Sequence, residues 1–216
     1  MAKYKYTGQV FINCPFDDKY IKLFRALVFT ILDCGFVPRC SLEIDDATVF
    51  RLHGIVKLIE QCKYGIHDLS RVQLHSKSKL PRFNMPFELG IFYGAKTFGK
   101  RNQSKKTCIV LEKERYRYQK FISDLSGIDI APHNNSIKKI IIAVRNWLVT
   151  SSRRTTIPDS NSIYSRYQKF QRAFKTACTY NGIDINAVPF VELAKNMTDW
   201  LKINQEVHIP LFRKAP

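Results

Sequence analysis

The feature that most constrains the fold of this chain is a regular alternation of short β-rich runs and longer segments with helical periodicity. Strand-like runs lie at residues 8–13, 36–40, 64–69, 107–111 and 128–130, and helical periodicity lies between them at residues 17–31, 49–59 and 85–93 and after them at 137–149. Parallel strands need crossover connections, and these are right-handed, so the alternation predicts a parallel sheet with helices on both faces. We therefore expect an α/β fold of Rossmann-like, flavodoxin-like layout with about five strands.

The last third of the chain has a different pattern. Residues 151–160 lack periodicity and are predicted to be a linker. The next segment is amphipathic, with one face formed by Ile163, Tyr167, Phe170, Phe174 and Ala177 and the opposite face by Arg166, Lys169, Arg172 and Lys175. A shorter helix is expected at residues 188–201. The predicted organisation is an α/β domain at residues 1–150, a linker at 151–160 and a C-terminal helical extension at 161–216.

Composition excludes several classes of protein. Hydrophobic residues make up 45% of the chain, enough for a real core. The longest strongly apolar run, residues 27–32, is far short of the ~20 residues that span a bilayer, and the N-terminus lacks a signal-like stretch, so we expect a soluble, cytoplasmic protein without membrane contact. The six cysteines are scattered, which favours buried thiols over disulfides or a zinc site. No metal ligand or cofactor is assigned.

The net charge of +17 is the compositional outlier. A field of that sign attracts polyanions, so nucleic acid, phosphorylated ligands and acidic protein partners are all encouraged. No zinc-finger or RNP pattern accompanies the charge. For the basic helix after residue 160, a solvated positive face over a docking stripe is favoured over a helix that reads DNA.

Candidate chemistry centres on residues 80–90, which follow a basic loop. Asn84 is expected at the N-cap of a helix and Pro86 in its first turn, and Glu88 then stands alone among apolar neighbours. A carboxylate in such surroundings costs free energy unless it is partnered or used. The alternative is a first-turn glutamate that the helix dipole favours. Walker A, Gly-x-Gly-x-x-Gly, His-Glu-x-x-His and Gly-x-Ser-x-Gly motifs are absent.

The end of the third strand supplies a second candidate. Alternation along the strand places Asp68 on one side and His67 on the other, so Asp68 is the rim residue and His67 is expected to pack or cap. Ser70 and Arg71 follow directly and are expected to bind a phosphate at the mouth of the site. For Arg71, an ordinary surface charge is the alternative.

Three stretches carry a resemblance in the right order: VFINCPF at residues 10–16, CKYGIHDLS at 62–70 and NMPFELG at 84–90. Over residues 8 to about 130, the chain resembles the superfamily of nucleoside 2-deoxyribosyltransferase-like and prokaryotic TIR-like proteins. In these families a glutamate in the helix after the third strand is catalytic, which implies that role for Glu88. An acid near the end of the third strand corresponds to Asp68. The basic insertion at residues 70–84 and the C-terminal helices depart from the pattern and leave the substrate open.

The resemblance implies cleavage of an N-glycosidic bond, with NAD favoured as substrate and not as cofactor, in bacterial antiviral defence or signalling. A carboxylate stabilises the positive charge that develops on the anomeric carbon, or attacks it. We expect the Pro15–Phe16 turn to hold a flat base and the loop from Arg71 to Arg82 to hold a pyrophosphate. Asn13 and Asn84 complete the expected binding residues.

Two alternatives remain open. One is a non-catalytic module of the same fold that senses a nucleotide or binds nucleic acid or protein through the basic loop and C-terminal helix. The other is a nucleoside 2-deoxyribosyltransferase, in which Asp68 protonates the leaving base, because a purine or pyrimidine needs a proton to depart whereas nicotinamide leaves neutral. Many relatives act as assemblies, so a homo-oligomer or a partner protein is expected.

Overall fold

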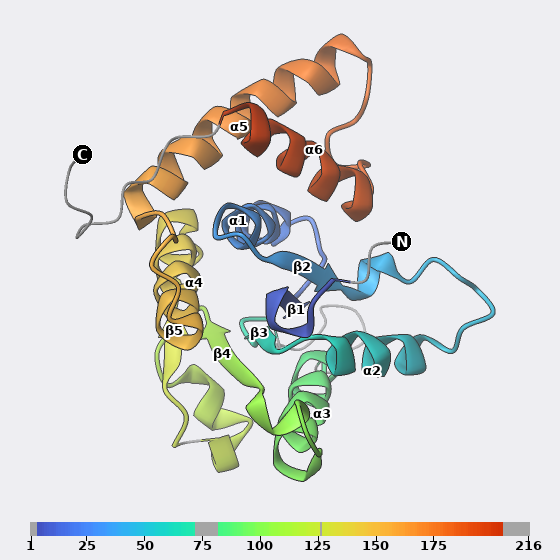
Figure 1. Ribbon diagram of the computed structural model, residues 1–216, viewed down its shortest axis with the longest axis vertical. Coiled ribbons are helices and arrows are strands. Elements are labelled where there is room, and N and C mark those ends of the chain that lie inside the picture. The colour runs from blue at the N-terminus through green and yellow to red at the C-terminus, as the bar shows by residue number, and fades with distance from the viewer. Residues whose placement is uncertain (1–3, 72–81, 126, 205–216) are drawn as a thin grey trace.

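The computed structural model describes residues 4–71, 82–125 and 127–204. Within these ranges, five strands form one parallel sheet in the order β2-β1-β3-β4-β5 (Figure 1). The strands are β1 (Gln9–Asn13), β2 (Val37–Cys40), β3 (Tyr64–Asp68), β4 (Thr107–Glu112) and β5 (Ile130–Pro132). The predicted α/β fold with about five parallel strands is confirmed, although β5 begins two residues later than expected.

Helices cover both faces of the sheet, as predicted. They are α1 (Ile21–Asp33), α2 (Arg51–Gln61), α3 (Asn84–Phe98), α4 (Ile137–Ser152), α5 (Ser160–Tyr180) and α6 (Phe190–Ile203). Because successive strand residues point to opposite faces, β1 places Ile12 in a core with α1 and α4, and Phe11 in a core with α2 and α3. Figure 1 shows these two helical layers on either side of the sheet.

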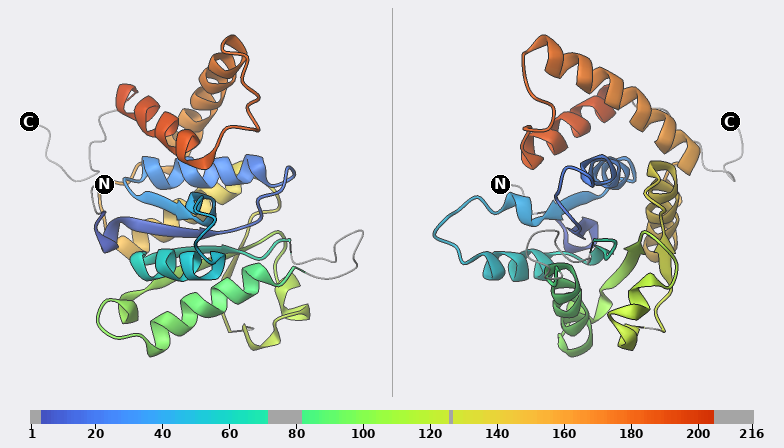
Figure 2. Two further views of the ribbon diagram at one scale, coloured as in Figure 1. Left: turned by 90° about the vertical axis from the view of Figure 1, so that its right-hand side faces the viewer. Right: turned by 180° about the vertical axis from the view of Figure 1, so that it is seen from behind.

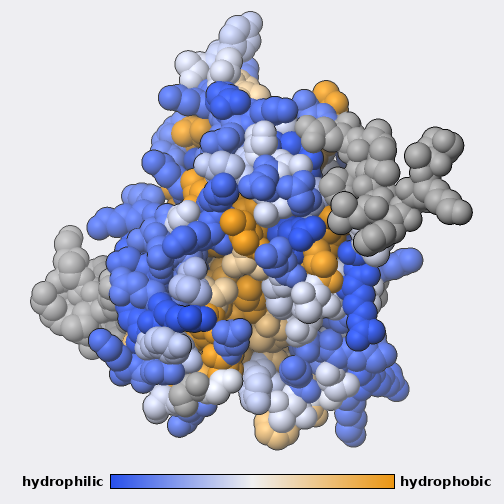
Figure 3. All heavy atoms as spheres, turned by 90° about the vertical axis from the view of Figure 1, so that its left-hand side faces the viewer, coloured by the Kyte–Doolittle hydropathy of each residue, from blue (hydrophilic) through white to orange (hydrophobic). Residues whose placement is uncertain are grey.

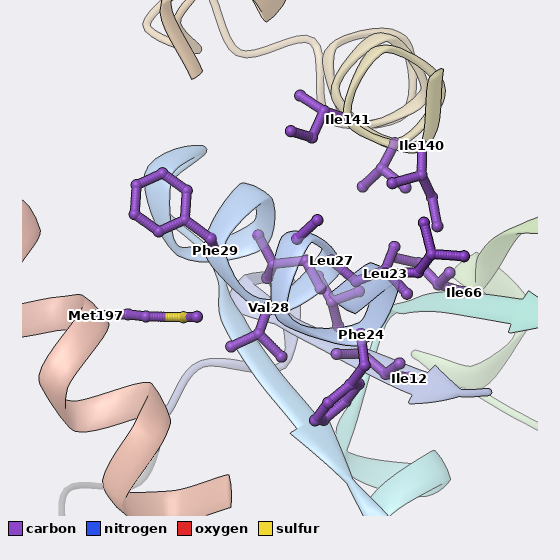
Figure 4. Packing of buried hydrophobic residues seen from close by; sticks show 14 of the residues in the cluster. Ile12, Leu23, Phe24, Leu27, Val28, Phe29, Ile66, Ile140, Ile141 and Met197 are labelled. Atoms are coloured by element: carbon purple, nitrogen blue, oxygen red, sulfur yellow. The ribbon is translucent and has the colours of Figure 1, made fainter. Parts of the chain in front are cut away.

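Helix α1 is apolar over most of its circumference, and the structure covers most of it. Eight of its residues, including Leu27 and Phe29, are buried. Figure 4 shows Ile12 and Ile66 of the sheet on one side of α1, Ile140 and Ile141 of α4 on another, and Met197 of α6 beyond Val28 and Phe29. A helix that is apolar over so much of its circumference needs such enclosure.

The C-terminal helices α5 and α6 supply the outer cover of α1 (Figure 2). The ring of Phe29 lies 5.4 Å from that of Tyr167 and 6.0 Å from that of Trp200. Residues 153–159 connect α4 to α5, and Ile157 among them is buried in the same core. Asp159 caps α5 by accepting hydrogen bonds from backbone N–H groups. The helical extension therefore shares one continuous core with the sheet, while the division into domains stays a prediction.

The predicted basic face of α5 is wrong at one position, because Arg166 is buried rather than outward-facing. Its guanidinium donates to both carboxylate oxygens of Asp33, at 2.9 and 3.1 Å, where α1 ends. Ala177 is exposed, and Cys178 takes the buried position expected of it. The ion pair between Arg166 and Asp33 therefore joins α5 to α1.

The outer surface of α4 and α5 is largely polar. Figure 3 shows this side of the molecule, where hydrophilic residues lie on both sides of a narrow hydrophobic band. Among the described residues, none of the helices has the length and apolar character needed to cross a membrane.

Candidate functional site

The candidate site lies at the carboxyl edge of the sheet, between β1 and β3. These strands are neighbours, but the helices that follow them, α1 and α3, lie on opposite faces. The loops after β1 and β3 therefore diverge. In open α/β sheets, ligands bind at such a switch point beyond the carboxyl ends of the strands.

Glu88 is the fifth residue of α3, and its side chain is half-buried. No side chain or backbone group among the described residues hydrogen-bonds to its carboxylate. Burial raises the pKa of Glu88 to about 7, and the nearby Arg51 guanidinium opposes that rise. The carboxylate thus has a raised pKa and hydrogen-bonding capacity to spare, which is the condition expected of a group that acts on a ligand.

Asn13 fixes the position of the helix that carries Glu88. The side chain of Asn13 is buried at the end of β1, and its Nδ2 donates to the Met85 carbonyl at 2.8 Å. The same nitrogen lies 3.0 Å from Nδ1 of His67. Asn13 was predicted to bind substrate; in the structure its amide nitrogen is occupied by the protein and ties the first turn of α3 to two strands.

His67 packs into the core, as the alternation along β3 predicts. Its ring lies 6.0 Å from that of Phe11 and 5.0 Å from that of Phe92. Burial, with a smaller contribution from the Lys106 charge, lowers the pKa of His67 to about 3. The imidazole is therefore neutral at physiological pH, and it supports the site from the α2–α3 side of the sheet.

Asp68 is fully buried on the opposite side of β3. The Tyr20 hydroxyl donates to its Oδ2, His133 Nε2 lies 3.1 Å from the same oxygen, and the Ser70 N–H donates to its Oδ1 at 2.8 Å. Burial opposes ionisation, but hydrogen bonding with His133 and the other donors leaves the pKa of Asp68 below its ordinary value. The ionised, buried carboxylate of Asp68 accepts hydrogen bonds that join β3 to the start of α1 and to the turn after β5. Such a group is not suited to donate a proton to a leaving base.

Both carboxylates act on Cys14, the residue after β1. Burial is the main cause of the high pKa of the Cys14 thiol, and the charges of Asp68 and Glu88 raise it further. The end of β1 therefore lies within electrostatic reach of both predicted catalytic acids. Of the two, only Glu88 is partly exposed.

The turn after β1 presents one aromatic ring to solvent. Pro15 is buried, while Phe16 is 37% exposed and packs edge-on against Phe24, with ring centroids 5.2 Å apart. Phe16 is thus available to stack on a flat group. Whether it contacts a ligand stays a prediction.

Arg71 and Arg82, which lie after β3 and before α3, both pair with Asp17 in the loop after β1. Arg71 Nη2 lies 2.8 Å from Asp17 Oδ1, and Arg82 Nη1 lies 3.2 Å from Oδ2. Burial opposes ionisation of Asp17, but its hydrogen bonds and ion pairs with the two arginines lower its pKa. The trio keeps one net positive charge. Most of the predicted basic loop, residues 72–81, lies outside the described residues.

Two further expectations concern single residues. Asn84 was predicted to cap α3, but the helix begins at Asn84, and Phe83 occupies the N-cap position with helical dihedral angles and no side-chain cap. The helix starts one residue earlier than expected, because Phe83 already has helical backbone dihedral angles. Ser70 is buried, and its hydroxyl has no partner among the described residues.

Sequence reasoning missed a buried polar group beside Asp68. Glu112 ends β4 with its side chain fully buried, and it pairs with Arg117 at 2.8 Å. Arg117 also donates to the Ser70 carbonyl at 2.6 Å, which links β4 to the end of β3. Tyr20 and His133 were missed too. The one sequence signal is that Glu112 ends a strand and His133 directly follows one, at the edge of the sheet where polar groups gather.

Two hollows of the described surface are lined by residues other than Glu88. A groove of about 340 Å³ lies over α5, and a smaller one of about 200 Å³ is lined by the segment around Tyr116 and Ile128. Neither includes a predicted site residue. Among the described residues, no group of three or more His, Cys, Asp or Glu side chains is arranged to hold a metal ion.

Comparison with known proteins adds no relative. No protein-family model matches the chain, and no curated protein or solved structure matches it. The resemblance carried by residues 10–16, 62–70 and 84–90 stays a prediction, and the functional argument rests on the chain's own residues.

Proposed function

We propose that the protein cleaves the N-glycosidic bond of a nucleotide, with NAD as its favoured substrate and Glu88 as its catalytic carboxylate. The observation that carries this proposal is the state of Glu88: half-buried at the switch-point edge, without a hydrogen-bond partner among the described residues, and with a pKa of about 7. A defence or signalling role follows from the sequence resemblance alone.

The chemistry needs little beyond one ionised carboxylate. The bond between the anomeric carbon and the nicotinamide nitrogen breaks, its electron pair leaves with nicotinamide, and positive charge develops on the ribosyl group. The Glu88 carboxylate stabilises that charge, and its partial burial strengthens the attraction by excluding water. Water then adds to the anomeric carbon and releases one proton, giving ADP-ribose. Nicotinamide leaves neutral, so no acid is required.

The segments after β1 and β3 carry groups that fit the other parts of such a ligand. Phe16 supplies an exposed ring for a flat base. Arg71 and Arg82 supply two guanidinium groups, and a pyrophosphate would compete with Asp17 for them. Asn13 acts as a positioning residue, because it holds the first turn of α3 in place.

The test is to incubate purified protein with NAD and separately with deoxynucleosides, and to measure released nicotinamide or base. We expect nicotinamide from NAD, and a loss of about 10³-fold or more in Glu88→Gln. Glu192→Gln, an exposed glutamate on α6, is the matched control and should keep the wild-type rate. Equal activity in Glu88→Gln and wild type would end the proposal.

A second candidate function, binding of nucleic acid without catalysis, is favoured by the groove over α5. Its floor includes Phe170 and Phe174, and its rim carries Arg25, Arg172 and Lys175 without an acidic residue. Since Arg166 is buried, charge reversal is better placed at Arg172 and Lys175. Binding through this groove predicts strong salt dependence, loss of affinity in Arg172→Glu with Lys175→Glu, and no effect of Glu88→Gln. Affinity that is insensitive to salt would exclude it.

A further inference from the structure

The groove over α5 is a concavity in which three separate segments of the chain meet. It has a volume of about 340 Å³ and is lined by Arg25 of α1, by residues of α5 and by Ile185 of the loop between α5 and α6. Arg25 Nη2 donates to the Ile185 carbonyl at 2.6 Å, which ties this loop to α1 (Figure 2). The volume lies at the small end of the roughly 300–1,000 Å³ range of small-molecule sites. The groove is therefore of a size for one small ligand.

Three cations and no acidic residue line the groove. Arg172 and Lys175 are exposed, and neither forms an ion pair with a described residue. Arg25 is half-buried; its Nη2 also lies 3.3 Å from Asn186 Oδ1, but its buried Nε has no hydrogen-bond partner among the described residues. A groove whose charged residues all have one sign concentrates ligands of the opposite sign. The groove over α5 therefore favours an anion.

The floor of the groove is apolar and aromatic. The rings of Phe170 and Phe174 lie nearly parallel, with centroids 5.3 Å apart and planes 16° from each other. Ile185 lines the same groove and is half-buried. A flat ring bound against these side chains removes apolar surface from water. The ligand that fits both the floor and the cations therefore combines a flat ring with a negative charge.

Two glutamine side chains in the groove have unused acceptors. Gln168 Nε2 donates to the Tyr164 hydroxyl and Gln171 Nε2 donates to the Tyr167 hydroxyl, both at 3.1 Å. The Oε1 atoms of both glutamines accept no hydrogen bond from a described residue. An amide oxygen accepts from N–H and O–H groups. A ligand that uses these atoms carries such donors, as the sugar hydroxyls and base amino groups of a nucleotide do.

We propose that the groove over α5 is a binding site for a free nucleoside monophosphate, with its base on the aromatic floor and its phosphate at Arg172 and Lys175. The groove contains neither Glu88 nor any residue of the edge between β1 and β3. It is therefore separate from the proposed catalytic site, and binding there does not depend on cleavage of NAD.

Charge favours a free nucleotide over a nucleic-acid strand in this groove. A terminal phosphate carries about 1.5 to 2 negative charges at pH 7, whereas each phosphate inside a strand carries one. Three cations around a groove for one unit match the higher charge. The positive surface is also interrupted: Asp184 precedes Ile185 in the loop, and Arg166, one turn before Phe170, is buried in its ion pair with Asp33.

Calorimetric titration with adenosine 5′-monophosphate and with uridine 5′-monophosphate tests the proposal. Wild type should bind at least one of them, and the groove variant, Arg172→Gln with Lys175→Gln, should lose about 10-fold or more of that affinity. The control, Lys195→Gln with Lys202→Gln, lowers the net charge equally at exposed positions of α6 outside the groove and should bind like wild type. No binding of either nucleotide to wild type, or equal binding by the groove variant, would overturn the proposal.

The separate parts of the nucleotide test whether ring and phosphate bind together. Adenosine and inorganic phosphate should each bind at least about 10-fold more weakly than adenosine 5′-monophosphate, because each makes only part of the contacts. Inorganic phosphate that binds as tightly as the nucleotide would show an anion site without a base contact and would contradict the proposal.

Chemical labelling of lysines locates the bound nucleotide. Lys175 should be protected from acetylation by an amine-reactive reagent when the nucleotide is bound, whereas the exposed Lys195 should be labelled at an unchanged rate. Mass spectrometry of the digested protein measures both. Nucleotide binding that is lost in Arg71→Gln with Arg82→Gln, without protection of Lys175, would place the nucleotide at the proposed catalytic site and overturn the proposal.

Nucleic acid is the competing occupant of the groove. A single-stranded oligonucleotide of about ten nucleotides without terminal phosphates should bind no more tightly than the mononucleotide. Tighter binding of the oligonucleotide that falls steeply with salt, and that the groove variant loses, would assign the groove to nucleic acid and overturn the proposal of a free nucleotide.

Discussion

Helices α1 and α3 have nearly the same apolar character and opposite surroundings. Helix α1 follows β1 and is enclosed by the sheet, α4 and the C-terminal helices, so that Phe29 has no exposed surface. Helix α3 follows β3 and is covered on one side only by the part of the chain that the structure describes, where Phe87 and Phe98 are largely exposed. Burial by neighbouring elements, and not amino-acid composition, therefore separates a core helix from one that is open to a ligand or a partner.

The two acidic residues near this edge of the sheet show the same contrast. Asp68, on the α1 side, is enclosed and saturated with hydrogen bonds, while Glu88, on α3, is half-exposed and without a partner among the described residues. On the enclosed side of the sheet, Asp68 stabilises the fold. On the open side, the Glu88 carboxylate is available to act on a ligand.

The largest effect is expected from the covered helix. Phe29→Ala removes a ring that packs against Tyr167, Phe170 and Trp200, and should lower the free energy of unfolding by about 3 to 5 kcal/mol. Phe98→Ala on α3 should change it by less than about 0.5 kcal/mol. Denaturant titration of dilute protein measures both. Similar losses in the two variants would show that α3 is as enclosed as α1.

The second-largest effect on stability is expected from the ion pair that joins α1 to α5. Arg166→Ala leaves the Asp33 carboxylate, which is 8% exposed, without its bidentate partner. The free energy of unfolding should fall by about 3 kcal/mol. Arg172→Ala, which removes an exposed arginine from the same helix, is the control and should be nearly neutral. A neutral result for Arg166→Ala would contradict the buried pairing.

The Asp68→Asn variant tests whether Asp68 stabilises the fold or takes part in catalysis. Loss of the charge weakens three contacts at once and should lower the free energy of unfolding by about 2 to 3 kcal/mol. Because the pKa of Asp68 is lowered by folding, its stabilising effect is present at neutral pH and is lost as pH falls towards that pKa.

The same variant also distinguishes the substrates. If NAD is cleaved, folded Asp68→Asn should retain most of the rate. A loss of about 10²-fold with deoxynucleosides, beside no NAD cleavage by wild type, would instead favour the deoxyribosyltransferase alternative.

The smallest stability effect is expected at Glu88 and has the opposite sign. Folding raises its pKa from 4.5 to about 7, so the folded state loses stability as pH rises through that range. Glu88→Gln should therefore stabilise the protein by about 1 to 2 kcal/mol near pH 8, with the side chain's partial exposure taken into account, and by nothing near pH 4. Thermal unfolding at both pH values measures this. Destabilisation at pH 8 would assign Glu88 a structural role.

Much of the fold follows from the sequence because strands and helices alternate with clear periodicity. The strands and most helix ends were predicted to within about two residues, but α3 runs five residues beyond its predicted end at residue 93, and α1 begins four residues after its predicted start at residue 17. His67 was expected to pack. The predictions fail where tertiary contacts decide: Arg166 follows the helical pattern of an outer face but meets Asp33 across 133 residues of chain. The partners of Asp68, namely Tyr20 and His133, come from distant segments, so no local pattern reveals them.

We infer that α3 carries an ionisable carboxylate that acts on a glycosidic bond. The most direct test is nicotinamide release from NAD by wild type and Glu88→Gln, measured from about pH 6 to about pH 8. Wild-type turnover should rise with pH and follow a single ionisation near 7, and Glu88→Gln should show no measurable turnover at any of these pH values. A Glu88→Gln rate equal to that of wild type, with the same pH profile, would contradict the account.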